Sequence, residues 1–168
     1  MSERIHDAVE ALRKKFGTSD PFDLVDALGI HFGYTNASKL KGYYAVQNRE
    51  RFIRVNANLR ESEQRIVLAH ELGHDQRHRE LARVHPLRDS SLYDMSSKFE
   101  HQANLYAAEL LIPDQDVLDC IAEELDYLAM CRTLSIDPHL MAFKMFSMVQ
   151  RGYHVNVPQN LDSRFLRG

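Results

Sequence analysis

The sequence has no tryptophan and only two cysteines among its 168 residues. Cys120 and Cys131 form no Cys-x-x-Cys pattern, so we expect two reduced thiols rather than a disulfide framework or a cysteine metal site. No apolar run is long enough to cross a membrane, and the first residues do not have the pattern of a secretory signal. These absences predict a cytoplasmic protein. A net charge of −3 gives no general attraction to nucleic acid or to an anionic membrane surface.

Hydrophobic residues make up 44% of the sequence, enough for the core of one folded domain. We expect a single domain over residues 1–168, with a polar tail over about 153–168. Apolar residues at helical spacing, with capping and breaking residues at the ends, predict helices over 3–16, 21–28, 60–78, 97–112, 114–123, 124–134 and 138–151. The polar segment 79–95 predicts a loop. Shorter segments of β type predict strands over 30–34, 42–47 and 51–55.

The expected fold class is therefore α+β, a mostly helical domain with a small three-stranded sheet that precedes the helix over 60–78. The last two predicted helices, 124–134 and 138–151, have the order of a helix-turn-helix. The second of them is rich in methionine and phenylalanine rather than in lysine and arginine. This composition favours a helix that packs in the core or against a partner over one that contacts DNA.

The helix over 60–78 contains the sequence His70-Glu71-Leu72-Gly73-His74. Residues four apart lie one turn apart on the same face of an α-helix, so both imidazoles can bind one ion. Glu71 flanks that face, where it can reach a metal-bound water without being a ligand. The motif predicts a zincin-like domain with His70 and His74 as zinc ligands and Glu71 as the catalytic base. The alternative is a pair of core histidines that are hydrogen-bonded to the backbone.

A zinc site of this type needs a third protein ligand. In metzincins the helix motif continues with a glycine and a third histidine, but Arg77 and Glu80 occupy those positions here. A glutamate from a following helix is the other common solution, and Glu100 is the candidate. Asn104 lies one turn further along the helix over 97–112, on the same face, where its side-chain oxygen can accept the outer N–H of a ligating histidine.

Other interpretations of these residues stay open. Ser97 and Glu100 fit a capping box, in which the Glu100 side chain bonds back to the start of its helix. The other candidates for the ligand role are His78, His85 and His101. We expect His78 to lie too far along its helix to bind the ion. We expect it instead to contact one of the metal-binding residues or the substrate. We expect His85 and His101 to be solvated surface residues.

A second motif follows the first, since residues 100–113 have the sequence EHQANLYAAELLIP. Together with the motif at 70–74, it resembles the ImmA/IrrE family of zinc metallopeptidases. The segments 42–44 (GYY) and 53–56 (IRVN) are compatible with the same family, and the resemblance covers roughly residues 20–150. By this resemblance, the zinc ligands are His70, His74 and Glu100, and the catalytic base is Glu71.

The resemblance further implies a function like that of the anti-repressors of phages and mobile elements. Such a zinc-dependent endopeptidase cleaves, at a specific site, a helix-turn-helix transcriptional repressor encoded nearby and so relieves repression. We expect no fused DNA-binding domain of the kind that some family members carry, and we therefore expect the repressor as a partner in trans, with no direct contact to nucleic acid or membrane. After the second histidine the family has bulky apolar residues, whereas this chain has Asp75-Gln76-Arg77, a departure that bears on how the helix end packs.

The rival interpretation is a binding module, a zinc-stabilised protein that sequesters a repressor or toxin without cutting it. A purely structural site has no use for Glu71 and would close all four coordination positions with protein ligands, which favours the enzyme. The group that stabilises the oxyanion of the reaction stays open among Tyr43, Tyr44, Tyr106 and His78.

Overall fold

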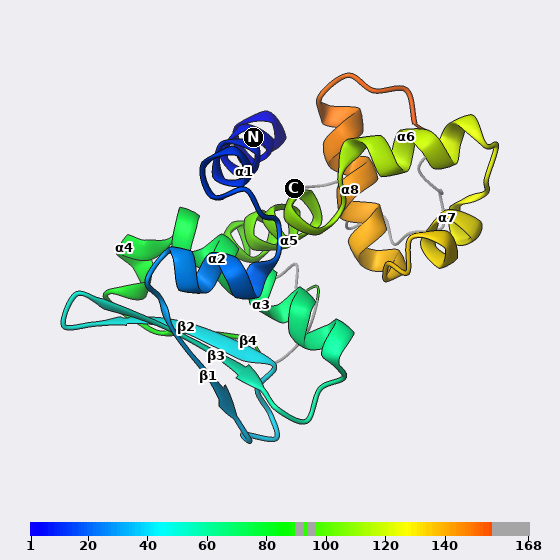
Figure 1. The fold of residues 1–168 in the computed structure, drawn as a ribbon. Helices are drawn as coiled ribbons and strands as arrows, with labels where there is room; N and C mark the ends of the chain where they lie inside the picture. Colours follow the sequence, from blue (N-terminus) through cyan, green and yellow to red (C-terminus); the bar gives the residue numbers. More distant parts are fainter. Residues whose placement is uncertain (90–92, 94–96, 156–168) are drawn as a thin grey trace.

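The computed structural model describes residues 1–89, 93 and 97–155 (Figure 1). In chain order, its elements are α1 (Ser2–Phe16), α2 (Pro21–Ala27), β1 (His31–Thr35), β2 (Gly42–Gln47), β3 (Glu50–Asn56), α3 (Glu61–Arg77), α4 (Arg79–Ala82), β4 (Leu87–Asp89), α5 (Lys98–Leu111), α6 (Asp114–Ala122), α7 (Tyr127–Thr133) and α8 (Pro138–Gln150). None of the described helices is both long and apolar enough to span a bilayer. Most of the predicted tail, residues 156–168, lies outside the described residues.

The predicted helices agree with the structure to within one residue at each end, except for the one over 124–134. Its counterpart, α7, begins later because Glu124 has a left-handed φ of 56°, which interrupts a right-handed helix. Asp126 then caps α7 by accepting a hydrogen bond from the N–H of Ala129. α8 is a core helix, as its composition predicts, and it buries Leu140, Met141, Phe143, Met145 and Met148.

Within the described residues, the sheet has four strands in the order β1-β3-β2-β4. β2 and β3 form an antiparallel hairpin, and the two residues that connect them, Asn48 and Arg49, have φ of 50° and 69°. Two left-handed turn residues suit the right-handed twist of the flanking strands. β1 pairs in parallel with the other edge of β3. The α+β class is confirmed, whereas the prediction of a three-stranded sheet is wrong.

The strand that the sequence does not reveal is β4, which pairs antiparallel with the outer edge of β2. It lies in the segment 79–95, for which the sequence predicts a loop, and the short helix α4 lies in that segment too. β4 has only three residues and follows Pro86, so it shows no readable alternation of apolar and polar side chains. It is a strand because β2 offers a free edge, which is information that no local pattern contains.

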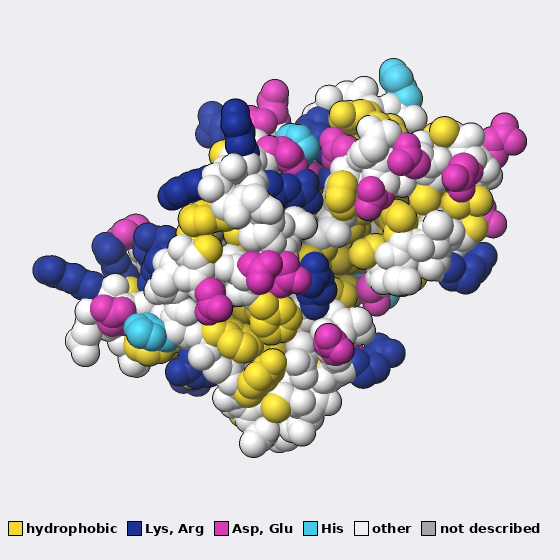
Figure 2. Space-filling view, in the orientation of Figure 1, with side chains coloured by type: hydrophobic (Ala, Val, Ile, Leu, Met, Phe, Trp, Pro, Cys, Tyr) yellow, Lys and Arg dark blue, Asp and Glu magenta, His cyan; other side chains and the backbone are white. Residues whose placement is uncertain are grey.

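α3 is the central helix, and it lies between the sheet on one side and α5 on the other (Figure 1). Gly73 allows the close approach of α5, because a Cβ at this position would lie 3.0 Å from both Ala103 Cα and Tyr106 Cβ. Acidic and basic side chains are interspersed over the outer surface seen in Figure 2, in keeping with the small net charge of the sequence.

The polar end of α3 packs through charge rather than through apolar contact. Asp75 is 1% exposed, and its carboxylate accepts a hydrogen bond of 2.8 Å from the Tyr44 hydroxyl. The same carboxylate pairs with Arg51 at 3.1 Å and with Arg79 at 3.2 Å. A buried carboxylate with these partners is satisfied, so the departure from an apolar sequence after His74 is accommodated.

A second buried network of ion pairs joins α5, α6 and α8. Lys144 is fully buried, and its Nζ lies 2.7 Å from Glu109 Oε2 and 2.5 Å from Asp114 Oδ1. Arg151 forms two hydrogen bonds of 2.6 Å and 2.7 Å to the carboxylate of Asp114, and His6 Nδ1 lies 3.0 Å from Glu109 Oε2. Burial acts to raise the pKa of Glu109, but Lys144 lowers it below its usual value. Lys144 and Arg151 therefore already neutralise the carboxylates of Glu109 and Asp114.

We predict that Lys144→Met lowers the free energy of unfolding by about 3–5 kcal/mol, because it removes a partner from a buried carboxylate. Urea unfolding followed by circular dichroism measures the change. Lys14→Met, at an exposed position of α1, is the matched control and should stay within about 0.5 kcal/mol of the wild type. A Lys144→Met protein as stable as the control would show that the network does not stabilise the fold.

Candidate metal centre

Two histidines of α3 face the same buried space. His70 is 6% exposed and His74 is fully buried, and their Nε2 atoms lie 3.1 Å apart. The spacing of four residues places the two rings one helical turn apart. All residues of α3 from Val67 to Asp75 are buried, so this part of the helix is packed on every side.

Glu100 joins these rings from the first turn of α5. Its Oε2 lies 3.2 Å from His70 Nε2, and its Oε1 lies 3.6 Å from His74 Nε2. Ser97 caps the helix by accepting a hydrogen bond of 3.2 Å from the Glu100 N–H. The backbone of Glu100 therefore serves the cap, while its side chain is directed at the two histidines.

A fourth side chain, Asp89 at the end of β4, also reaches this space. Its Oδ2 lies 3.1 Å from His70 Nε2 and 3.9 Å from His74 Nε2. One donor atom from each of His70, His74, Asp89 and Glu100 lies within 4.8 Å of the others. Sequence reasoning missed Asp89 because its position depends on the pairing of β4 with β2.

The hydrogen bond from His70 to Asn104 fixes the protonation of the His70 ring. His70 Nδ1 lies 2.9 Å from Asn104 Oδ1, which is the contact that the spacing on α5 predicts. An amide oxygen only accepts, so Nδ1 carries a proton and Nε2 of His70 is the nitrogen left to bind a cation, either a proton or a metal ion. That nitrogen points into the cluster.

A chain of hydrogen bonds has the same effect on His74. His78 Nε2 lies 2.9 Å from Gln102 Oε1, so this nitrogen donates and the Nδ1 of His78 accepts. His74 Nδ1, 2.9 Å from that atom, then donates and leaves its own Nε2 bare. Burial lowers the pKa of His78 to about 4, so the ring is neutral at neutral pH. His78 thus contacts His74, one of the proposed metal ligands, and is not itself one of the four clustered residues.

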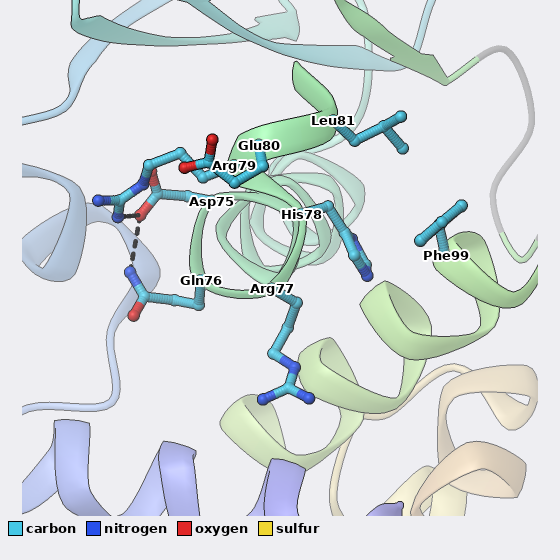
Figure 3. Close-up of a pocket in the computed structure, with 8 residues that line it drawn as sticks. All are labelled: Asp75, Gln76, Arg77, His78, Arg79, Glu80, Leu81 and Phe99. Atoms are coloured by element: carbon cyan, nitrogen blue, oxygen red, sulfur yellow. Dashed lines mark hydrogen bonds and ion pairs between the residues drawn. The ribbon is translucent and has the colours of Figure 1, made fainter. Parts of the chain in front are cut away.

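His78 also faces outward, toward a surface pocket at the end of α3. Figure 3 shows its ring directed at Phe99 of α5, with Asp75 and Arg79 on the opposite side of the helix. The ring centroids of His78 and Phe99 are 5.1 Å apart. Residues 75–81 and Phe99 line this pocket, and none of the four cluster residues does.

The chemistry of the cluster fits a cation. Burial opposes protonation of His70, but Asp89 and Glu100 outweigh burial and raise the pKa of His70 to about 9. Burial also acts to raise the pKa of Glu100, and the two histidines lower it well below its usual value. Two carboxylates that converge on the Nε2 atoms of the histidines favour positive charge among them, which a proton on His70 supplies when no metal ion is bound. A metal ion supplies that charge, and this donor set suits one.

Glu71 lies beside the cluster, close to the carboxylates of Asp89 and Glu100. It is fully buried, and neither carboxylate oxygen has a hydrogen-bond partner among the described residues. Burial raises the pKa of Glu71 well above its usual value, and the charge of Asp89 adds to the effect. Gly42 of β2 leaves room for this side chain, because a Cβ there would lie 2.5 Å from Glu71 Oε1.

The two other histidines that were candidates for the ligand role, His85 and His101, differ in burial. His85 is exposed, as predicted. The prediction of a solvated His101 is wrong, because this residue is 4% exposed and its ring lies 5.7 Å from those of Phe143 and Phe146 on α8. Its position next to Glu100 on α5 turns it toward α8, so the packing of two helices decides its burial. Of the tyrosines considered for the oxyanion, Tyr44 is engaged with Asp75.

Comparison with known proteins identifies the family. Residues 25–136 match the sequence model of Peptidase_M78, the IrrE N-terminal-like domain. The chain belongs to this metallopeptidase family. The predicted resemblance to the ImmA/IrrE family is thereby confirmed, and the matched region of this Peptidase_M78 chain contains the four-residue cluster and Glu71.

Two curated relatives agree with this membership. The Peptidase_M78 chain is 36% identical over 108 residues to "Uncharacterized immunity region protein 2" of Bacillus phage phi105, a match that covers 64% of this chain and 67% of the relative. It is 29% identical over 116 residues to "Metallopeptidase ImmA" of Bacillus subtilis (strain 168), a match that covers 68% of this chain and 66% of the relative. The match thus spans about two thirds of the length of each relative.

We predict that Gly42→Ala lowers the free energy of unfolding by about 1–3 kcal/mol, the usual cost of overpacking a core. The added Cβ would lie 2.5 Å from Glu71 Oε1 and 2.6 Å from Val67 Cγ1. Gly33→Ala is the matched control, because its Cβ would meet only the flexible side chain of Arg54, at 3.1 Å. Urea unfolding of both variants measures the difference, and equal effects would contradict a role of Gly42 in making room for Glu71.

Proposed function

We propose that this protein is a zinc-dependent endopeptidase in which His70, His74 and Glu100 bind the ion and Glu71 is the catalytic base. The observation that carries the proposal is the convergence of these donors in one buried space beside a glutamate without a partner. Two imidazoles and one carboxylate are a ligand set of zinc hydrolases. Membership in a metallopeptidase family supports the same conclusion.

Bound zinc supplies Lewis acidity, which polarises the scissile carbonyl and lowers the pKa of a water molecule. Asn104 accepts from His70 Nδ1–H and so keeps the His70 Nε2 directed at the ion. His78 does the same for His74. Glu71 takes the proton of the attacking water on its carboxylate and passes it to the leaving amine. Glu71 would be ionised more readily with an ion bound, because positive charge nearby would oppose the burial that raises its pKa.

The proposed substrate is a helix-turn-helix transcriptional repressor that is encoded nearby and cleaved at a specific site. The names of the relatives, an immunity region protein and the metallopeptidase ImmA, support a substrate that acts in phage immunity. Cleavage would relieve repression of phage or mobile-element genes. Because such a repressor acts on DNA inside the cell, the proposed reaction takes place in the cytoplasm.

A second candidate function is sequestration of a repressor or toxin without cleavage. Asp89 favours it, because it completes a set of four donors, the number that a structural zinc site uses. Glu71 favours the enzyme, because a buried carboxylate without a partner is costly and a structural site gains nothing from it.

We predict that Glu71→Gln retains one zinc per chain but cleaves the repressor about 10²- to 10⁴-fold more slowly, the usual contribution of a general base. His70→Ala should lose both zinc and cleavage. Zinc content is measured by elemental analysis, and cleavage by mass spectrometry after incubation with the product of the neighbouring regulator gene. His85→Ala, which removes an exposed histidine outside the cluster, is the control and should behave as the wild type.

The same incubation separates the two candidate functions when it is run with and without a chelator. Fragments that form only without chelator support the peptidase, whereas intact repressor that co-elutes with the protein supports sequestration. Cleavage by Glu71→Gln at the wild-type rate would show that Glu71 is not the base.

A further inference from the structure

Asp89 is a buried carboxylate for which the proposed hydrolysis has no use. It is 8% exposed, and its Oδ2 lies 3.1 Å from His70 Nε2 and 3.9 Å from His74 Nε2. No hydrogen-bond donor among the described residues satisfies this oxygen. A buried carboxylate in this state requires a cation, and the nearest place for one is the space that Asp89 shares with the two histidines and Glu100.

Asp89 also occupies the side of the cluster where Glu71 lies. Gly42 is the partner of Asp89 in the β2–β4 ladder, and the same glycine borders Glu71 Oε1, which a Cβ would approach to 2.5 Å. The carboxylate of Asp89 is therefore packed into the space bounded by the two imidazoles and Glu71. Hydrolysis needs a water molecule in that space, between the ion and the base.

Zinc sites that only stabilise a fold fill all four positions with protein ligands, whereas catalytic sites keep one position for water. We propose that Asp89 is a fourth protein ligand of the metal, that it holds the site in a closed resting state, and that hydrolysis requires Asp89 to leave. The inference rests on the proposed function of the same site. The exchange is one of ligands only, since a water molecule takes the position that the carboxylate vacates.

The strand that carries Asp89 is the part of the site with the weakest support. β4 contributes three residue pairs to the edge of β2, and the N–H of Lys41 donates to the Asp89 carbonyl at 2.7 Å. The other three donors lie on helices of 17 and 14 residues that pack in the core. Short edge pairings open at a smaller cost than buried helices, so Asp89 is the donor that can withdraw while the site persists.

The first test is the affinity for zinc, measured by competition with a chromophoric chelator. Asp89→Asn keeps the size of the side chain and replaces the carboxylate with a weaker ligand. We expect it to weaken zinc binding by about 10- to 100-fold, as changes near a bound metal commonly do. Arg88→Ala is the control, because Arg88 is the exposed neighbour on the same strand and should leave the affinity unchanged. Thermal unfolding of each variant verifies that it folds.

The second test measures whether the site is closed, and it does not depend on activity. Acetohydroxamate is titrated into the Co²⁺-substituted protein, and its binding is followed by the visible absorption of cobalt. A ligand that must wait for a minor open state binds more weakly by the fraction of that state. If the open state is about a tenth of the population, Asp89→Ala should bind acetohydroxamate about tenfold more tightly than the wild type.

The third measurement is the rate of repressor cleavage at saturating zinc, which should rise in Asp89→Asn by a similar factor. Unchanged zinc affinity, unchanged acetohydroxamate affinity, or slower cleavage than in the wild type would each overturn the closed resting state. If no protein cleaves but both binding results are as expected, the proposed peptidase function fails and the assignment of Asp89 as a fourth ligand stands.

Discussion

Two imidazole nitrogens lie 3.1 Å apart in a buried space that also holds carboxylates, so this space favours a cation, and the rest of the structure depends on this constraint. Asn104 and His78 each contact the Nδ1 of one ring, so both rings present their Nε2 to the shared space. Two carboxylates add negative charge at the same point. The arrangement therefore suits a bound metal ion, which brings positive charge to both rings and both carboxylates.

The surrounding fold brings these groups together at short range. Gly73 lets α5 approach α3 closely enough for Glu100 and Asn104 to reach the histidines, and Gly42 lets the sheet approach α3 next to Glu71. Both glycines are required for space rather than for an unusual φ, because neither has a positive φ. The site is thus assembled between three layers, the sheet, α3 and α5, and its precision depends on how closely they pack.

Helical spacing is local information, and it is sufficient to predict which residues of α3 and α5 share a face. The structure places Glu100 beside both rings and Asn104 at the outer nitrogen of His70, where the spacing predicts them. Their roles toward a metal stay predictions. Asp89 is beyond such reasoning, because it reaches the site through the pairing of two strands that are distant in the sequence.

Packing between helices causes the other differences. The polarity of His101 predicts contact with solvent, but the aromatic rings of α8 cover it. The polar residues after His74 predict no packing partner, whereas arginines from β3 and α4 surround Asp75. In both cases the environment is supplied by another part of the chain, so a pattern within one segment does not contain it.

One metal ion is expected between α3 and α5, and crystals of the zinc-loaded protein would show its position. Diffraction recorded above and below the zinc absorption edge locates the ion by its anomalous signal. We expect a single peak at about 2.0–2.2 Å from the Nε2 atoms of His70 and His74 and from a Glu100 oxygen. The absence of a peak there, or a peak only beside Glu109 and Asp114, would contradict this expectation.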